Sequence, residues 1–319
     1  MTPTPQEVFR DRLAAVADFA RRTNKATVLV IQQFPTPDGC RVLFPNVRES
    51  IANILSFAEL GTAADLAWVL DAAGDHEFNW IAVDCDHKLA ESAAIVAFAR
   101  ARIAADRLLF YSDNQVWFDS GLDIVQRIEG GVTGKRVLLC GDGPLADCFR
   151  GALQRIGATV VDGVDLRDAE LLPAIVLGTA QKRTTIDEAL VDRLPADAAV
   201  YDIGIGNLTA AAAGRARARG LRLYRLDNRA GVSSAIVRLL ETDFMVGKLM
   251  GHLRVKNVDI VAGGLLAPPG AVIVDDIRDP AVIFGVADGS GRFREPLDAA
   301  DEEHIAFVRS LMRRGIAEP

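Results

Sequence analysis

The segment from residue 135 to residue 158 has the order of a short strand, a glycine turn and a helix. Residues 136–140 form an apolar run typical of a buried parallel strand, and residues 147–156 carry the apolar spacing of a helix. Between them, residues 141–146 fit the pattern G-x-G-x-x-A. In a dinucleotide-binding unit this turn brings the backbone close to a pyrophosphate, and the helix N-terminus offers its N–H groups to the anion.

The turn therefore predicts a nucleotide site, and a turn that only joins strand to helix is the alternative. The dipole of the following helix would favour an anionic ligand at the same place. The residues expected to contact the nucleotide here are Gly141, Asp142, Gly143, Pro144 and Leu145.

The composition is that of a soluble globular chain. Its 319 residues suggest two domains, and 50% of them are hydrophobic and 25% charged. The net charge of −7, without a Lys/Arg stripe, argues against a nucleic-acid partner. No apolar run approaches the ~20 residues needed to cross a membrane, and the N-terminus lacks the apolar core of a signal peptide. We therefore expect a cytoplasmic protein that binds a small molecule.

The four cysteines do not form a metal or disulfide pattern. Cys40, Cys85, Cys140 and Cys148 lie far apart or within predicted core elements, and none belongs to a C-x-x-C pair. This spacing is typical of reduced thiols in the cytoplasm. We expect neither a disulfide framework nor a metal site.

Strand and helix patterns alternate in residues 1–115, which predicts an N-terminal α/β substrate domain with a largely parallel sheet. The expected helices are residues 5–22, 47–60, 65–73 and 89–105. The expected strands are residues 27–33, 80–83 and 107–111.

A second alternating region, residues 116–250, predicts a Rossmann-like nucleotide-binding domain with a doubly wound parallel sheet. Besides the strand and helix around the turn, its expected strands are residues 159–161, 174–177, 199–203 and 221–225. Its expected helices are residues 186–194, 208–219 and, longer than these, 233–253.

Residues 251–319 differ in character and predict a C-terminal appendage of helix and strands. Two strands are expected at residues 272–274 and 282–286, and a closing helix at residues 301–313. The appendage either packs against the first domain or forms a contact between copies of the chain. We expect the protein to be a homo-oligomer, namely a dimer. The fold class is α/β with two lobes and this appendage.

Two loops after predicted strands extend the nucleotide site. In open α/β sheets, ligands bind outside the carboxyl ends of the strands, so both loops should face the turn at Gly141. Their candidate cofactor-binding residues are Gly178, Thr179, Ala180, Gly204 and Asn207.

Asp113 and Asn114 follow a strand and precede the helix that leads into the second domain. A carboxylate beside an amide at this junction suits a site that positions a substrate and moves its proton. The alternative is that one of the two side chains only caps the helix.

The densest polar cluster of the first domain also follows a strand, and contains Asp84, Asp86, His87 and Lys88. His87 is suited to acid or base catalysis near neutral pH, and Lys88 to holding a carboxylate. A solvated loop and a metal site are the alternatives, although nothing else in the sequence completes a metal ligand set.

The identity of the cofactor depends on an acid about twenty residues beyond the turn, which in NAD-binding proteins contacts the ribose. Asp162 and Asp165 lie close, but Val164 stands nearest the expected position. We name Asp165 as the candidate. Arg167 would instead favour the 2′-phosphate of NADP, so the choice between NAD and NADP stays open.

Residues 113–158 resemble the hinge and cofactor-binding entry of S-adenosylhomocysteine hydrolases. The shared features are the Asp-Asn pair, Ser120, Leu122, Arg127, Gly134-Lys135, the G-x-G turn and Ala152-Leu153. Residues 197–204 are similar to the strand and loop that enter that family's cofactor site. The resemblance implies a dinucleotide site. Tyr111 and Ile205 replace that family's catalytic lysine and loop histidine, which puts the hydrolase reaction in doubt.

The order of the whole chain is similar to the dehydrogenase of pyrrolysine biosynthesis. A weaker relative is the methyltransferase that acts on the pyridinol of the iron-guanylylpyridinol cofactor, which implies S-adenosylmethionine instead of a dinucleotide. We therefore expect an NAD(P)-dependent oxidoreductase acting on a small amino- or imino-acid-like substrate in the cleft between the lobes. Asp113 would be its general acid or base, Asn114 would position the substrate or nicotinamide, and His87 or Lys88 would bind a carboxylate. An S-adenosylmethionine-dependent methyltransferase and a non-catalytic nucleotide-binding protein are the alternatives.

Overall fold

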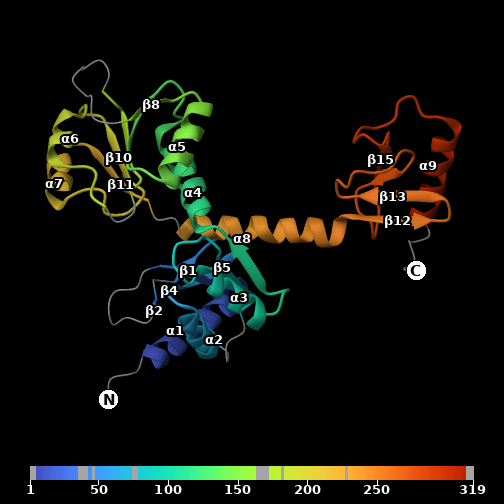
Figure 1. Cartoon of the computed structure of the whole chain (residues 1–319), viewed down its shortest axis with the longest axis horizontal. Helices are drawn as coiled ribbons and strands as arrows, with labels where there is room; N and C mark the ends of the chain where they lie inside the picture. Colours follow the sequence, from blue (N-terminus) through green and yellow to red (C-terminus); the bar gives the residue numbers. More distant parts are fainter. Residues whose placement is uncertain are drawn as a thin grey trace. The chain divides into compact units, whose positions relative to one another are not determined.

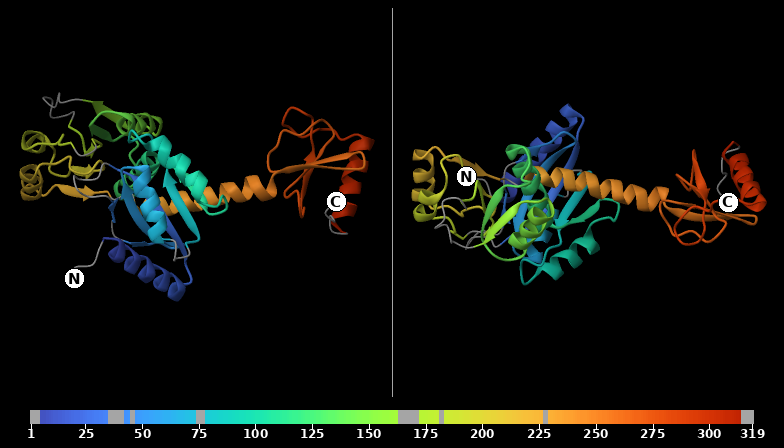
Figure 2. Two further views of the ribbon diagram at one scale, coloured as in Figure 1. Left: turned by 60° about the horizontal axis from the view of Figure 1, so that its bottom comes forward. Right: turned by 90° about the horizontal axis from the view of Figure 1, so that it is seen from above.

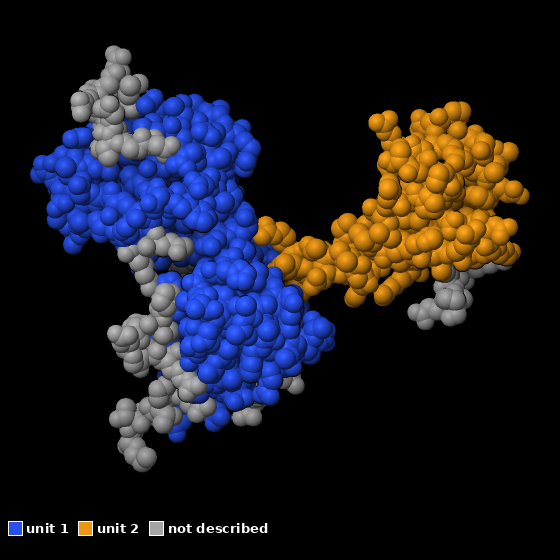
Figure 3. All heavy atoms as spheres, viewed as in Figure 1, with its two compact units in different colours: residues 1–236 blue, residues 237–319 orange. Residues whose placement is uncertain are grey.

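The computed structural model describes residues 5–34, 42–44, 47–73, 78–162, 172–180, 183–226 and 229–313. By its internal contacts the chain divides into two compact units, Met1–Ile236 and Val237–Pro319, which Figure 3 shows in blue and orange. Among these described residues, unit 1 holds two β-sheets and unit 2 holds one. The domain boundaries after residues 115 and 250 stay predictions.

The first sheet of unit 1 is mostly parallel and has the order β2-β4-β1-β5-β6, with β3 also pairing with β4. Its strands are β1 (Ala26–Gln33), β2 (Val42–Leu43), β3 (Arg48–Glu49), β4 (Asn53–Leu60), β5 (Trp80–Asp84) and β6 (Leu108–Tyr111). The strands β4, β1, β5 and β6 run parallel, whereas β2 and β3 run antiparallel to β4. The carboxyl ends of the four parallel strands therefore meet at one edge of the sheet.

Three helices pack on one face of this sheet: α1 (Pro5–Thr23), α2 (Ala63–Ala73) and α3 (Ser92–Arg102). Successive strand residues point to opposite faces, so Leu29 and Ile31 of β1 meet these helices, and Val28 and Val30 face away. All four are fully buried. Burial on both faces explains why β1 reads as a continuous apolar run and not as an alternating one.

The second sheet of unit 1 is entirely parallel in the order β11-β10-β9-β7-β8. Its strands are β7 (Arg136–Cys140), β8 (Thr159–Asp162), β9 (Ile175–Gly178), β10 (Ala199–Asp202) and β11 (Arg222–Arg225). The associated helices are α4 (Asp113–Glu129), α5 (Pro144–Arg155), α6 (Glu188–Arg193) and α7 (Ala210–Ala218).

Helices cover both faces of the second sheet (Figures 1 and 2). Leu139 of β7 packs in one core with Phe149 of α5 and Val125 of α4. Its neighbour Leu138 points the other way, into a second core with Leu190 of α6 and with residues of α7. This alternation confirms the predicted α/β class and the doubly wound parallel sheet.

Helix α8 (Arg229–Phe244) begins in unit 1 and crosses the division between the two units. Near its start, Gly231 lies so close to α4 that an added Cβ would stand 2.6 Å from Cβ of Ser120. Oγ of Ser233 lies within hydrogen-bond distance of Oγ of Ser50, at 2.7 Å, and of Oδ1 of Asn53, at 2.9 Å. Within unit 1, the start of α8 therefore contacts helix α4 of the second sheet and the start of strand β4 of the first sheet.

Unit 2 contains a four-stranded sheet in the order β12-β13-β14-β15, made of β12 (Gly251–Val255), β13 (Val258–Ala262), β14 (Val272–Val274) and β15 (Ile283–Val286). Helix α9 (Ala299–Met312) packs on it through Val308, which is fully buried with Ile260 and Val272. A capping box between Asp298 and Asp301 begins α9. No helix within the described ranges is long and apolar enough to span a membrane.

Two predicted helices are wrong in whole or in part. Residues 47–60, predicted as a helix, form β3 and β4, because the apolar residues of 53–60 pair along the whole of β1. The helix predicted at residues 233–253 begins at Arg229, ends at Phe244 and is followed by a π-helical turn, Met245–Leu249. Its predicted last turn is strand β12, which forms a hairpin with the unpredicted strand β13.

Candidate functional site

Each sheet of unit 1 has one point where the strand order reverses. In the first sheet β1 lies between β4 and β5, and in the second β7 lies between β8 and β9. In the second sheet the loops after β7 and β9 lead to helices on opposite faces, α5 and α6, and such a divergence opens a crevice at the carboxyl ends of the strands. The predicted polar residues cluster at both points.

At the reversal point of the second sheet lies a cavity of about 340 Å³. It is lined by Asn114, Asp142, Pro144, Leu145, Thr179, Ala180 and Arg183. Six of these seven residues were predicted from the sequence, and Arg183 was not. The loops after β7 and β9 therefore face each other, as expected.

Glycines are required at the turn between β7 and α5. Gly141 has a φ of 147°, and an added Cβ would stand 2.5 Å from Oγ1 of Thr179 and 2.6 Å from the amide nitrogen of Ala180. Gly143, with a φ of 87°, precedes the first helical residue, Pro144, and provides no side-chain cap. The N–H groups of the first helical turn are therefore left without a capping side chain, as an anion-binding helix end requires.

The Thr179 hydroxyl is a second indication of a ligand. Thr179 is 1% exposed, and its Oγ1 has no hydrogen-bond partner within the described part of the chain. A buried hydroxyl without a partner costs about 1–3 kcal/mol. Because Thr179 lines the cavity, a bound acceptor such as a phosphate or ribose oxygen would satisfy it. The cavity thus fits the phosphate-bearing part of a dinucleotide.

Three predicted cofactor-binding residues form the wall behind the cavity. Asn207 is fully buried, and its side chain donates to the carbonyl oxygen of Ala180 at 3.0 Å and accepts from the amide of Ala180 at 3.1 Å. A Cβ at Gly178 would stand 2.6 Å from Cβ of Asn207, and one at Gly204 would stand 2.1 Å from the carbonyl oxygen of Ala180. Their roles as ligand contacts stay predictions, while their packing shapes the loop that carries Thr179 and Ala180.

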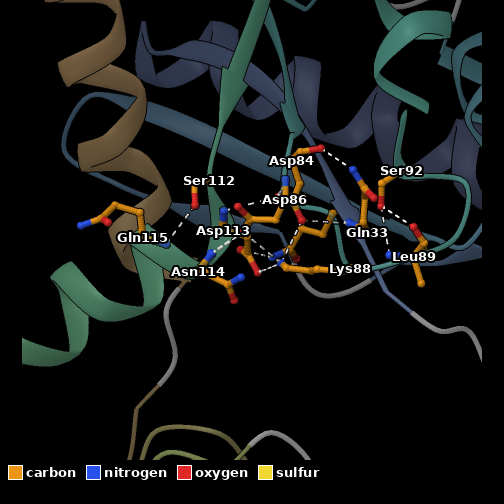
Figure 4. A network of polar contacts seen from close by, with 11 residues as sticks. Gln33, Asp84, Asp86, Lys88, Leu89, Ser92, Ser112, Asp113, Asn114 and Gln115 are labelled. Carbon is orange, nitrogen blue, oxygen red and sulfur yellow. Dashed lines mark hydrogen bonds and ion pairs between the residues drawn. The ribbon is translucent and has the colours of Figure 1, made fainter. Parts of the chain in front are cut away.

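At the reversal point of the first sheet, Lys88 is held between carboxylates (Figure 4). Its Nζ lies 2.8 Å from Oδ2 of Asp84, 2.6 Å from Oδ2 of Asp113 and 3.8 Å from Oδ2 of Asp86. The side-chain amide of Gln32 donates to the other oxygen of Asp113 at 3.0 Å. We call Asp84, Asp86, Lys88 and Asp113 the lysine cluster.

Burial determines the protonation of this cluster. Asp84 is fully buried, and desolvation together with the negative charge of Asp113 raises its pKa to about 6 although Lys88 opposes the change. Desolvation acts to lower the pKa of Lys88, but the carboxylates of Asp113 and Asp84 outweigh it and raise the pKa. Lys88 is therefore an ammonium at neutral pH, whereas Asp84 changes its charge under mildly acidic conditions.

Two buried groups beside the cluster have no hydrogen-bond partner among the residues that the structure describes, Oη of Tyr111 and Oε1 of Gln33. Tyr111 pairs with Asp84 across β6 and β5, and burial followed by the charge of Asp113 raises the pKa of its phenol well above the usual range. Gln33 donates to the carbonyl oxygen of Asp84 at 2.6 Å. The end of β1 thus contributes an amide, and the end of β6 a neutral phenol, to the surroundings of Lys88.

The N-terminus of α4 belongs to both sites. Ser112 caps the helix by accepting from the amide of Gln115 at 3.2 Å, so Asp113 is not needed as the cap and its carboxylate binds Lys88. The next residue, Asn114, donates its backbone N–H to Oδ2 of Asp86 at 2.7 Å and lines the cavity at the glycine turn. The lysine cluster and the cavity therefore adjoin at two consecutive residues.

Some predicted residues are not brought to these sites. The side chain of His87 is exposed, and Asp165 lies outside the described residues together with Val164 and Arg167. Within the described ranges no group of His, Cys, Asp and Glu side chains is suited to hold a metal ion. The residues that the sequence interpretation missed are Gln32, Gln33, Tyr111 and Arg183. Two signals were available: the polar pair at the end of the apolar run 27–31, and the place of Tyr111 at the position of the catalytic lysine of S-adenosylhomocysteine hydrolases.

Comparisons with known proteins give weak similarities. No protein-family model matches the chain, and no curated protein matches it. Among solved structures, the chain is similar to the methylenetetrahydrofolate dehydrogenase-cyclohydrolase of Trypanosoma brucei, which was solved with NADP and an inhibitor. The sequence identity is 16% and the TM-score is 0.36, and the match covers 75% of this chain and 92% of the other. It is also similar to the corresponding bifunctional enzyme of Thermoplasma acidophilum, at 12% identity and a TM-score of 0.39 over 74% and 97% of the two chains.

A chorismate mutase/shikimate 5-dehydrogenase fusion protein of Clostridium acetobutylicum matches at 10% identity and a TM-score of 0.37, over 69% of this chain and 92% of that chain. All three similar proteins are dehydrogenases by name. The resemblance to S-adenosylhomocysteine hydrolases and to the dehydrogenase of pyrrolysine biosynthesis stays a prediction.

Proposed function

We propose that this chain is an NAD(P)-dependent oxidoreductase that acts on a small amino- or imino-acid-like substrate. The observation that carries the proposal is the placement of Asp113 and Asn114. One of these consecutive residues belongs to the lysine cluster, and the other lines the cavity beside the glycine turn. A cofactor in the cavity and a substrate at the cluster would therefore be neighbours, as a direct transfer between them requires.

The cavity is suited to the phosphates of a dinucleotide. The uncapped N-terminus of α5 offers backbone N–H groups, Gly141 and Gly143 carry no side chain that could cover them, and the Thr179 hydroxyl has no hydrogen-bond partner among the described residues. When bound there, a nicotinamide cofactor supplies hydride acceptance or donation, which no side chain performs. Asn114, which lines the same cavity, would orient the group that reacts.

The charges of the lysine cluster favour a substrate nitrogen. Three carboxylates surround one ammonium, and carboxylates accept hydrogen bonds from a substrate ammonium or iminium group. Asp113 would remove a proton from the substrate ammonium, which makes the neutral amine that can release a hydride. The cation Lys88 would keep the Asp113 carboxylate in place and bind the carboxylate of the substrate.

Binding and turnover test the proposal separately. NAD⁺ or NADP⁺ should raise the melting temperature of the purified protein by mass action, and amino acids should then reduce the nicotinamide in an absorbance assay. Asp113→Asn should leave nucleotide binding intact and lower turnover by about 10²–10⁴-fold, the usual contribution of a general base. Asp119→Asn is the matched control, because this carboxylate accepts a surface hydrogen bond from Gln115 on the same helix at 2.7 Å and is not among the residues that line the cavity.

The proposal fails if neither nicotinamide nucleotide changes the melting temperature. A shift with S-adenosylmethionine alone would support the methyltransferase alternative instead, which no observation on the described residues favours at present. Unchanged turnover in Asp113→Asn would remove the assigned role of this residue but leave the oxidoreductase activity in place.

A further inference from the structure

Arg183 lies at the nucleotide cavity but has no part in the function derived so far. It follows strand β9, on the loop that also carries Thr179, and it lines the cavity with Asp142, Pro144 and Leu145. Its guanidinium Nη2 lies 2.6 Å from Oδ1 of Asp142. The ion pair therefore joins the loop after β9 to the centre of the glycine turn.

The partner of Arg183 is placed unfavourably for an anionic ligand. Asp142 stands between Gly141 and Gly143, next to the N-terminus of α5 where phosphates would bind. A carboxylate at this position repels a diphosphate, unless a cation neutralises it. Arg183 provides that cation in the structure.

The ion pair is easily exchanged. The Arg183 and Asp142 side chains are 56% and 78% exposed, and pairs of such exposure contribute only about 0–1 kcal/mol. A guanidinium binds two phosphate oxygens at once and interacts more strongly with a doubly charged diphosphate than with a single exposed carboxylate. A diphosphate at the end of α5 would therefore compete successfully for Arg183.

We propose that Arg183 binds the pyrophosphate of a dinucleotide in this cavity, and that Asp142 holds its guanidinium over the glycine turn until the nucleotide arrives. The inference rests on the proposed function for the identity of the nucleotide. The recognition of a diphosphate by Arg183 stands on the ion pair, the uncapped helix end and the Thr179 hydroxyl, which has no partner in the described part of the chain.

Calorimetric titration of the full chain with NADP⁺, NAD⁺, ADP and adenosine tests the inference. Arg183→Gln should weaken the binding of ADP and of the dinucleotides by about 10- to 100-fold, the range of a charge-assisted hydrogen bond, and leave adenosine unaffected. Asp142→Asn should tighten diphosphate binding by about 2- to 5-fold, because a weak surface pair no longer competes. This tightening should be smaller when Arg183→Gln is also present.

The exposed pair between Arg215 and Asp192 provides the matched control. These side chains also approach to 2.6 Å and are 57% and 45% exposed, but neither lines the cavity. Arg215→Gln should therefore leave every affinity unchanged. Circular dichroism of all variants establishes that they are folded.

The outcomes separate the inference from the proposed function. If the wild-type chain binds a nicotinamide dinucleotide and Arg183→Gln binds it equally well, the inference is overturned and the proposed function stands. If ADP binding depends on Arg183 while neither dinucleotide binds, the inference of diphosphate recognition stands and the proposed function fails. Equal tightening by Asp142→Asn with and without Arg183 would overturn the holding role of Asp142.

Discussion

Replacement of Lys88 by methionine removes the one cation seen within the lysine cluster and leaves its carboxylates buried. The side chains of Lys88, Asp84 and Asp113 are 16%, 0% and 9% exposed, so little solvent is available to replace the lost ammonium. Breaking a buried ion pair from one side costs about 3–5 kcal/mol, because a charge is left without its partner. We expect Lys88→Met to lower the free energy of unfolding of unit 1 by this amount near neutral pH.

The loss should depend on pH with a definite sign. Asp84 already has a pKa of about 6, raised by burial, and Lys88 acts against that rise. Without Lys88 the pKa rises further, so the carboxyl takes up a proton and the unpaired charge disappears as the pH falls. A group whose pKa is higher in the folded state favours folding below its unfolded pKa and loses that contribution as the pH rises. The destabilisation should therefore be full at about pH 8 and smaller at about pH 5.

Urea unfolding followed by tryptophan fluorescence measures this effect, because Trp68, Trp80 and Trp117 all lie in unit 1. Arg102→Met is the control, since its pair with Asp71 is exposed and should contribute about 1 kcal/mol or less. A loss of less than about 1 kcal/mol in Lys88→Met at pH 8, or the same loss at both pH values, would refute the described burial and pairing.

Two further substitutions test the second sheet. Gly204→Ala places a Cβ 2.1 Å from the carbonyl oxygen of Ala180, so it should destabilise unit 1 by about 3 kcal/mol in urea unfolding. Gly214→Ala is the control and should not destabilise unit 1, because an added Cβ there meets nothing within 4 Å. Glu129→Gln should cost about 2 kcal/mol, because the carboxylate accepts from Oη of Tyr201 at 2.5 Å and is 5% exposed. Burial acts to raise the pKa of Glu129, but its hydrogen bonds outweigh burial and lower the pKa. The carboxylate therefore stabilises the fold above its unfolded pKa. The difference in unfolding free energy between variant and wild type should shrink as the pH falls below about 4.

The sequence was most informative where local chemistry determines the structure. The glycine turn could be predicted because its conformation depends on residues that are neighbours in the sequence. Gly141 and Gly143 can adopt a positive φ, and Gly143 has no side chain that could cap α5. Residues 47–60 could not be assigned in this way, since the spacing of their apolar residues also suits a helix. Their strand conformation depends on pairing with β1, which is a tertiary interaction.

The candidate site was predicted as separate motifs and not as one arrangement. The polar residues after β5 and the Asp-Asn pair after β6 were both named, but the 2.6 Å contact between Lys88 and Asp113 depends on β5 and β6 being neighbours. The pair between Asp142 and Arg183 joins residues 41 positions apart in two loops. No pattern in one sequence reveals such a contact.

The shared position of Asp113 and Asn114 at the start of α4 makes this helix end intolerant of length changes. Successive helical residues are rotated by about 100°, so one residue inserted after Ser112 would turn both side chains away from their present neighbours at once. A substitution can alter the substrate cluster or the nucleotide cavity alone, whereas an insertion or deletion at this position would disrupt both. Among variants of this chain, the loop between β6 and α4 should therefore keep a constant length even where its residues differ.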